Sequence, residues 1–345
     1  MSFDRKCKKY QEDLDYIISS FDIKQLYSKS ILVTGATGLI GTLLIDCLMK
    51  LNSQGASIMI YALGRSKERA FERLGLYYHS PLFLFIEQDI QQALPGKIQI
   101  DYIIHGASNA HPLAYSQDPI GTLMTNIKGT ENILNKAVEC KATVLFMSTV
   151  EIYGNAREED VFTEDYTGNL NLANARSCYP ESKRLCEAMC QSYITQKGVD
   201  VKIVRLSRVF GPTMIESDSK ASAQFLKKAK AGDNIVLKSD GMQYYSYTYA
   251  ADAVSAIFYV LLNGSRGVAY NVSNNNCNIL LKDFALLCAG FNGKEVVYEL
   301  PSDTESKGFS GATQAIMDNT RLLSIGWKPS YNMEKAIFNT LSIMK

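Results

Sequence analysis

Tyr179 and Lys183 are four positions apart in the segment Tyr-Pro-Glu-Ser-Lys. Residues with this spacing share one face of a helix, so the phenol and the ammonium group would lie together. A neighbouring ammonium favours the phenolate, and we expect Lys183 to lower the pKa of Tyr179 towards the pH at which a general base works. Thr149 follows the predicted strand at 143–147, and at this strand end it can hydrogen-bond the substrate oxygen that Tyr179 protonates or deprotonates. We predict that these three side chains act as one catalytic group.

A glycine-rich loop, Gly-Ala-Thr-Gly-Leu-Ile-Gly, lies between a short apolar run and a helical pattern. Gly35 permits the tight turn, Gly38 lets the backbone approach a pyrophosphate, and Gly41 allows the helix to pack closely on the sheet. The helix N-terminus then directs free N–H groups at the anion. The loop therefore predicts dinucleotide binding. The loop residues that we assign to the cofactor are Gly35, Thr37, Gly38, Leu39, Ile40 and Gly41.

Two further positions bear on how the ribose and the adenine of the cofactor would be bound. An NAD site usually has an acidic residue at the end of the second strand, but this chain has Arg65 there and no acid before Glu68. Arg65 favours the 2′-phosphate of NADP, whereas an arginine stacked on the adenine is compatible with NAD. We keep both NAD and NADP as candidate cofactors and favour NADP. Asp89, followed by Ile90 after the third predicted strand, suits a hydrogen bond to the adenine amino group.

The elements that must position these residues alternate between strands and helices. Short apolar runs predict strands at 31–34, 58–62, 82–86, 102–104, 143–147 and 201–205. Helical patterns occur at about 66–76, 118–140 and 178–197. This alternation predicts an α/β fold with a doubly wound parallel (Rossmann) sheet, whose continuous apolar strands are covered on both faces.

Three regions can be separated by the change of pattern along the chain. Residues 1–29 predict an amphipathic helix docked on the main body. Residues 30–211 form the predicted NAD(P)-binding domain, to which the chain returns near 246–272. The rest of 212–345 forms a smaller, mixed α/β lobe that we expect to bind substrate.

Composition limits the class of protein. The 345 residues carry a formal net charge of +1, which argues against a nucleic-acid binder that relies on a general positive field. Apolar runs stay short of the roughly 18–20 residues of a membrane helix, and the charged N-terminus lacks the apolar block of a signal peptide. The eight cysteines show neither a Cys-x-x-Cys pair nor metal-ligand spacing. We expect a cytoplasmic protein with free thiols, without a metal site and without a membrane or nucleic-acid partner.

The ordered motifs resemble the extended short-chain dehydrogenase/reductase family, and within it the nucleotide-sugar epimerases, dehydratases and decarboxylases. The resemblance extends from about Ser30 to Trp327. Besides the glycine loop it rests on Asp89-Ile90, His105–Ser108, Asn126–Thr130, Ser148–Gly154, Tyr179–Lys183, Arg205–Pro212 and Tyr247–Asp252. It implies a tightly bound NAD or NADP, a nucleotide-diphosphate sugar whose C4 is transiently oxidised, and a role in making polysaccharide precursors. It also implies a homodimer formed through the helices at 118–140 and 178–197.

The same resemblance implies roles for single residues. Tyr179 is the base that takes a proton from a sugar hydroxyl, Lys183 holds the nicotinamide ribose, and Thr149 binds the reacting hydroxyl. Asn126 is a structural and water-organising residue behind Lys183. The further residues assigned to the cofactor site are Ala107 and Ser148.

The segment Thr149-Val150-Glu151 bears on the step after the oxidation. Related dehydratases have Thr-Asp-Glu or Thr-Ser-Glu, decarboxylases have Thr-Ser-Glu, and simple 4-epimerases lack an acid at the third place. In an extended chain Glu151 lies on the same side as Thr149, so we expect it near C5 and C6 of the sugar. Val150 cannot donate a proton to a leaving hydroxyl, which weakens the dehydratase hypothesis.

Several reactions therefore remain open. We rank decarboxylase-like or epimerase-like chemistry above 4,6-dehydration. An NADPH-dependent reductase of a nucleotide-linked keto sugar is the main alternative. A non-catalytic, cofactor-binding regulator is the least favoured, because Thr149, Tyr179 and Lys183 are all present.

Two residues depart from the family pattern at the substrate end. Arg208 stands where the family usually has Asn, and Tyr245 stands where it usually has the Arg that clamps the diphosphate. Either Arg208 replaces the missing clamp, since its fork suits phosphate oxygens, or the substrate binds differently. Lys220 is another candidate diphosphate contact. His111 is a candidate substrate contact, with a plain turn residue as the alternative.

Overall fold

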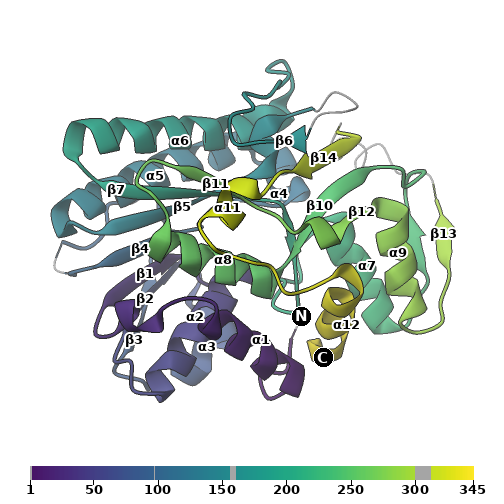
Figure 1. Cartoon of the computed structure of the whole chain (residues 1–345), viewed down its shortest axis with the longest axis horizontal. Coiled ribbons are helices and arrows are strands. Elements are labelled where there is room, and N and C mark those ends of the chain that lie inside the picture. Colours follow the sequence, from purple (N-terminus) through teal and green to yellow (C-terminus); the bar gives the residue numbers. More distant parts are fainter. Residues whose placement is uncertain (1, 97, 156–160, 300–311) are drawn as a thin grey trace.

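The computed structural model describes residues 2–96, 98–155, 161–299 and 312–345, with a parallel sheet of seven strands at its centre (Figure 1). The strands run in the order β11-β7-β5-β4-β1-β2-β3, and every neighbouring pair is parallel. Their bounds are β1 Ser30–Thr34, β2 Met59–Gly64, β3 Phe83–Glu87, β4 Tyr102–His105, β5 Thr143–Thr149, β7 Asp200–Leu206 and β11 Ala269–Val272. The predicted doubly wound α/β fold is confirmed. The strand order reverses between β1 and β4, where such sheets bind ligands beyond the carboxyl ends of their strands.

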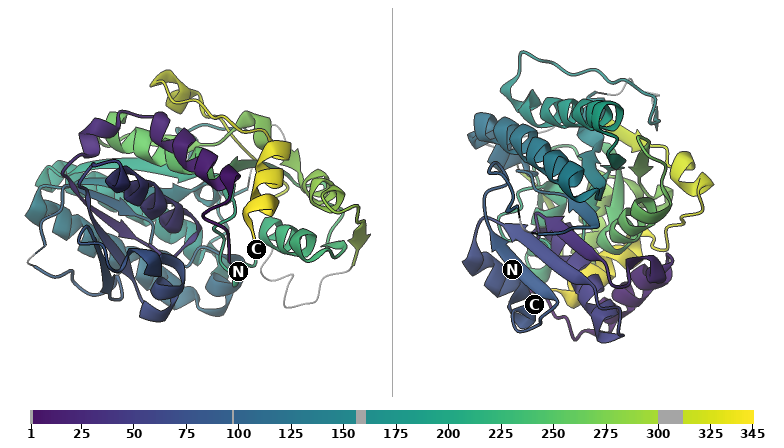
Figure 2. Two further views of the ribbon diagram at one scale, coloured as in Figure 1. Left: turned by 90° about the horizontal axis from the view of Figure 1, so that it is seen from below. Right: turned by 90° about the vertical axis from the view of Figure 1, so that its left-hand side faces the viewer.

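Helices cover both faces of this sheet (Figures 1 and 2). Two of them, α5 (Pro119–Cys140) and α6 (Cys178–Lys197), share one buried cluster with Val144 and Phe146 of β5. Leu145, between these two residues, packs into the opposite cluster with α2 (Leu39–Ser53) and α8 (Ala250–Asn263). Successive side chains of a strand point to opposite faces, so a strand buried on both faces is apolar at almost every position. The shorter helical elements in this part of the chain are α3 Lys67–Leu74, α4 Pro112–Gln117, η2 Gly75–Tyr77, η3 Val150–Tyr153 and η4 Ala175–Ser177.

Smaller sheets lie beside the central one. Five strands form a sheet with the order β12-β10-β14-β6, in which β8 also pairs with β10, and β13 pairs with β9. Their bounds are β6 Val161–Phe162, β8 Arg208–Phe210, β9 Ile235–Leu237, β10 Tyr244–Tyr249, β12 Asn278–Leu280, β13 Val296–Tyr298 and β14 Gln314–Met317. The remaining elements are η5 Asn275–Cys277 and the helices α7 Ala221–Ala231, α9 Leu281–Gly290, α11 Thr320–Ser324 and α12 Met333–Ile343. The domain limits at residues 29 and 211 stay predictions.

The N-terminal region differs from the single helix that its pattern predicts. Helix α1 covers only Lys8–Ser19, and a separate 3-10 turn, η1, covers Ile23–Leu26. The helix ends where Phe21 turns into the core, and Asp22 caps the next turn by accepting a hydrogen bond from Lys24 N. The two ends of the described chain meet nearby, where Phe3 pairs with Met344 (Figure 2).

Helix α1 is held by a buried carboxylate, Asp13. It accepts hydrogen bonds from the hydroxyls of Tyr249 and Tyr331 and from Asn339 Nδ2, which come from β10, the segment before α12, and α12 itself. Burial raises the pKa of Asp13 to about 6, while these hydrogen bonds and the charge of Lys335 act in the opposite direction. The folded protein therefore favours the protonated form of Asp13 more than the unfolded chain does.

This raised pKa has a measurable consequence for stability. Since the folded pKa exceeds the ordinary value of 3.8, the contribution of Asp13 is greatest below about pH 4 and is lost as the pH rises through about 6. The loss amounts to about 3 kcal/mol. The free energy of unfolding of Asp13→Asn, measured with urea at pH 4 to 7, should lack this part of the pH dependence. The exposed Asp15→Asn, on the same helix, is the control. If the free energy of unfolding changed with pH in the same way in Asp13→Asn and in the wild type, this account would be contradicted.

The cysteines, the helices and strand β10 can each be described from the structure. All eight cysteines are free, as predicted. Among the described residues, we find no helix with the length and apolar character that crossing a membrane would need. The tyrosine-rich strand β10 is packed on both faces, because every residue of it except Tyr244 is buried.

Candidate active site

A cavity of about 1160 Å³ opens at the carboxyl ends of β1, β4 and β5. It reaches from the glycine loop to β8 and β10, so it spans the central sheet and the smaller one. Most predicted site residues line it: Gly35, Thr37, Gly38, Leu39, Ile40, Gly41, Arg65, Ile90, Ala107, His111, Ser148, Thr149, Glu151, Tyr179, Lys183, Arg208, Lys220 and Tyr245. Residues that are far apart in the sequence thus share one cavity.

The glycine loop has the geometry of an anion cradle. Gly35 has a φ of +70°, a conformation that favours glycine. A Cβ atom on Gly41 would lie 2.3 Å from the carbonyl oxygen of Gly35, so the close turn requires glycine there as well. Helix α2 starts after Gly38 without a side chain capping its first N–H groups, and this end faces the cavity. The loop therefore fits a dinucleotide phosphate group.

The predicted catalytic side chains meet at the inner part of the cavity. Tyr179 and Lys183 lie one turn apart at the start of α6, and both are buried. The ammonium of Lys183 donates a hydrogen bond of 2.8 Å to Met147 O and lies 4.8 Å from the ring centre of Phe146. A side-chain hydrogen bond joins Tyr179 to Thr149, the last residue of β5. The two local motifs are therefore in contact.

The expectation that Lys183 lowers the pKa of Tyr179 is wrong for this structure. Burial raises the pKa of Tyr179 and the charge of Glu151 raises it further, whereas the hydrogen bond from Thr149 and the charge of Arg176 lower it. Lys183 is not among these causes, and its ammonium is hydrogen-bonded to Met147 O. Burial also lowers the pKa of Lys183 itself.

Glu151 reaches the cavity by a different route from the one we expected. The chain after Thr149 is a turn of 3-10 helix, η3, and is not extended. The turn is capped by Thr149, whose hydroxyl accepts a hydrogen bond from Glu151 N at 3.3 Å. Arg176 Nη2 lies 3.2 Å from one carboxylate oxygen of Glu151, so the carboxylate faces a cation. Val150 is buried and lines the cavity.

Tyr115 and Arg176 are site residues that the sequence analysis missed. The ring of Tyr115 stacks on that of Tyr179, with centres 5.2 Å apart and planes at 13°. Arg176 donates to the hydroxyl of Tyr115 at 3.2 Å, and this hydroxyl in turn lies 3.4 Å from Glu151. Arg176 stands three positions before Tyr179, and this short spacing in the sequence could have indicated that Arg176 lies near the site. Tyr115 comes from α4, and only the tertiary structure brings it to Tyr179.

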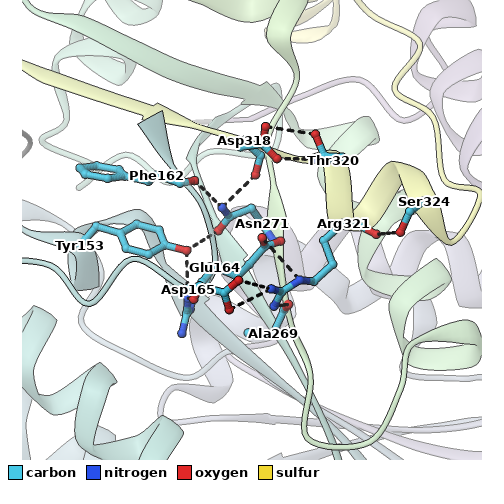
Figure 3. A network of polar contacts seen from close by, with 11 residues as sticks. Tyr153, Phe162, Glu164, Asp165, Ala269, Asn271, Asp318, Thr320, Arg321 and Ser324 are labelled. Atoms are coloured by element: carbon cyan, nitrogen blue, oxygen red, sulfur yellow. Dashed lines mark hydrogen bonds and ion pairs between the residues drawn. The ribbon is translucent and has the colours of Figure 1, made fainter. Parts of the chain in front are cut away.

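A second polar network holds η3 in position (Figure 3). The hydroxyl of Tyr153, the last residue of η3, donates 2.6 Å to Asn271 Oδ1 on β11. Asn271 in turn donates to the carbonyl oxygens of Phe162 and Asp318. Arg205 donates to the same tyrosine hydroxyl at 3.0 Å. The turn that carries Glu151 is therefore tied to both the central sheet and the smaller one.

Two predicted cofactor residues are not among the described residues that line the cavity. The carboxylate of Asp89 accepts a hydrogen bond of 2.9 Å from Gln91 N, while Gln88 and Ile90 line the cavity beside it. Asn126 is a buried residue of α5, and its Nδ2 donates a hydrogen bond of 2.8 Å to Ser182 Oγ on α6. Near Arg65, the sequence analysis missed two further residues that line the cavity, Ser66 and Arg69.

The substrate-end candidates differ in their partners. Lys220 Nζ lies 3.4 Å from Asp218 Oδ2. His111 Nδ1 lies 3.5 Å from Ser219 Oγ, and burial lowers the pKa of His111. Tyr245 is buried and donates its hydroxyl to Ala312 O at 2.6 Å. The guanidinium of Arg208 lies 3.5 Å above the centre of the Tyr245 ring.

Known proteins are similar to this chain over most of its length. A family model described as the NAD dependent epimerase/dehydratase family matches residues 31–273. UDP-glucuronic acid decarboxylase 1 of Danio rerio is 30% identical over 313 residues, covering 91% of this chain and 72% of that protein. UDP-glucuronic acid decarboxylase 6 of Arabidopsis thaliana is 32% identical over 244 residues, covering 71% and 69%.

Two solved structures share the fold. The UDP-glucuronic acid 4-epimerase of Bacillus cereus, a variant in complex with a fluorinated UDP-glucuronic acid and NAD, has a TM-score of 0.78 at 19% identity and covers 90% and 98% of the two chains. The dTDP-glucose 4,6-dehydratase DesIV of Streptomyces venezuelae, with NAD bound, has a TM-score of 0.77 at 22% identity and covers 90% and 95%.

Proposed function

Because this chain belongs to the NAD-dependent epimerase/dehydratase family, we propose that it modifies a nucleotide-diphosphate sugar through transient oxidation at C4, followed by decarboxylation of a uronic acid. The observation that carries the proposal is the meeting of Thr149, Tyr179 and Lys183 in one cavity with the glycine loop. The decarboxylases of Danio rerio and Arabidopsis thaliana, at 30% and 32% identity, support this choice of reaction. Epimerisation at C4 is the second candidate.

The cofactor is held by the glycine loop and the N-terminus of α2 at its phosphates, and by Lys183 at the nicotinamide ribose. When bound, the nicotinamide supplies reversible oxidation of the C4 carbinol. Arg65, joined in the cavity by Arg69, supports NADP, whereas the structural neighbours carry NAD. We propose that the cofactor is tightly bound, because each turnover regenerates it.

The residues around Tyr179 divide the chemistry between them. Thr149 hydrogen-bonds the C4 oxygen, and Tyr179 takes its proton. Glu151 acts beside C5 and C6 of the resulting 4-keto acid. As the C5–C6 bond breaks, its electron pair moves towards the C4 carbonyl and CO2 leaves without a proton, so the apolar Val150 is no obstacle. C5 then takes up a proton from water, and Tyr179 returns its proton to the C4 oxygen as C4 is reduced again.

The glycine loop offers a test of cofactor binding. A methyl group at Gly41 meets backbone atoms that cannot move aside, and overpacking of this kind costs about 1–3 kcal/mol. Gly41→Ala should therefore bind NAD about 10- to 100-fold more weakly in calorimetry. The control is Gly290→Ala, where an added Cβ has no neighbour within 4 Å. Equal affinity in the Gly41 variant would show that the close packing of α2 on the loop at Gly41 is not needed for cofactor binding.

The assembly and location are also proposals. We propose a homodimer through α5 and α6, whose exposed apolar residues Met124, Val138 and Leu185 support a contact between copies. Sedimentation of the purified protein tests this. Eight free cysteines support a reducing, cytoplasmic location, and the kinship with nucleotide-sugar enzymes supports a role in making polysaccharide precursors.

The first experiment identifies the cofactor and the reaction together. The purified protein is denatured and any released nicotinamide nucleotide is identified by mass. The intact protein is then incubated with UDP-glucuronic acid, and the molecular mass of the product is measured. Bound nucleotide near one per chain and a product lighter by CO2 support the proposal. An isomer of unchanged mass supports the epimerase, and a protein that binds cofactor only as added NADPH and reduces a keto sugar contradicts the proposal.

A further inference from the structure

We propose that Arg208, whose guanidinium lies over the ring of Tyr245, binds an oxyanion of the substrate. The proposal rests on the proposed function and specifies the group that its substrate must carry. The oxyanion is the diphosphate or the sugar carboxylate, which offer an arginine the same paired oxygens.

The first observation concerns hydrogen bonding. Arg208 Nη1 is buried and, within the described part of the chain, has no hydrogen-bond partner, although the residue lines the cavity. Buried N–H groups are almost always satisfied, so an unsatisfied one that borders a cavity points to a ligand. The other arginine with such a group, Arg176 at its Nε, is already paired with Glu151.

The second observation concerns charge. Among the described ion pairs, Lys220 is compensated by Asp218 at 3.4 Å, whereas Arg208 has no carboxylate partner. The charge of Arg208 nevertheless acts on the hydroxyl groups of Tyr115 and Tyr247. It lowers the pKa of each tyrosine, whereas burial raises it. Arg208 therefore supplies uncompensated positive charge between the catalytic residues and β10.

The third observation concerns the support of the guanidinium. The stacking distance of 3.5 Å is short for a cation over a tyrosine ring. The ring is fixed in turn, because the hydroxyl of Tyr245 donates to Ala312 O and the residue is buried. Strands β8 and β10 are paired in register, Arg208 opposite Tyr247, so the two side chains stay on adjacent strands. Tyr245 thus orients Arg208 in the cavity that both residues line, and a direct contact of Tyr245 with substrate stays a prediction.

Calorimetry with three probes tests the site. UDP carries the diphosphate alone, UDP-glucose adds a neutral sugar, and UDP-glucuronic acid adds the carboxylate. Arg208→Gln should weaken binding by roughly 10- to 100-fold, as expected for the loss of a charge-assisted hydrogen bond. A loss shared by all three probes identifies the diphosphate, and a loss confined to UDP-glucuronic acid identifies the carboxylate. Equal affinities of variant and wild type for all three overturn the proposal.

Matched variants of Tyr245 test the supporting role. Tyr245→Phe keeps the ring and should bind the probes within about twofold of the wild type, whereas Tyr245→Leu removes the ring face and should bind several-fold more weakly. The NAD content of each variant shows that the fold and the cofactor site are intact. A wild type that keeps its cofactor but binds none of the probes contradicts the proposed function, whereas unchanged binding in the Arg208 and Tyr245 variants contradicts this inference alone.

Discussion

Turnover of the nucleotide sugar should fall by about 10²- to 10⁴-fold in Tyr179→Phe, the range attributed to loss of a general base. The substitution removes the hydroxyl that is hydrogen-bonded to Thr149 but keeps the ring that stacks on Tyr115. The folded structure and the bound cofactor should therefore be retained. The effect is measured as the rate of a single turnover on a cofactor-loaded enzyme.

The control for this variant lies on the same helix. Tyr193 is towards the outside of α6 and donates its hydroxyl to Asn135 Oδ1. Tyr193→Phe removes a hydroxyl without touching the cavity, so it should keep the wild-type rate. If Tyr179→Phe retained more than about a tenth of that rate, Tyr179 would not be the base.

Glu151→Gln should have two separable effects. Overall turnover should fall by about 10²- to 10⁴-fold, because the carboxylate acts on C5 and C6 after C4 is oxidised. The oxidation itself should continue, and its pH dependence should shift. The negative charge of Glu151 raises the pKa of Tyr179, so removing that charge lowers the pKa and moves the rise in oxidation rate to lower pH.

Arg176→Met provides the opposite test. Arg176 lowers the pKa of Tyr179, and its loss should move the same profile to higher pH. The profile is recorded in single turnover from the absorbance of reduced nicotinamide. Shifts in opposite directions for the two variants support a charge pair that tunes Tyr179. If both variants lose activity with unshifted profiles, Glu151 and Arg176 only shape the cavity.

Several features could be predicted because they depend on residues close together in the chain. Gly35, Gly38 and Gly41 lie within one loop, and the backbone conformation of that loop admits few other residues. Tyr179 and Lys183 share a helix face through their spacing alone. Thr149 ends a strand whose apolar character was visible, and the carboxyl ends of parallel strands gather at one edge of a sheet. The sheet and the cavity edge could be predicted from these local patterns.

Other features required the folded chain. Tyr115 stacks on Tyr179 from another helix, Arg176 meets Glu151 because η3 turns the carboxylate back, and Arg208 lies on Tyr245 because β8 pairs with β10. The error about the pKa of Tyr179 has the same origin. Helical spacing shows which groups are neighbours, but burial, the hydrogen bond from Thr149 and the charges of Glu151 and Arg176 set the pKa of Tyr179.

The sequence by itself thus determined the class of fold, the phosphate loop and the Tyr-Lys pair, since these depend on local backbone geometry and side-chain periodicity. The tertiary structure alone decided which charges face one another, which hydroxyl groups are desolvated and which buried arginine N–H group finds no hydrogen-bond partner among the described residues. Those properties depend on packing between segments far apart in the chain, and on the exclusion of water that packing produces.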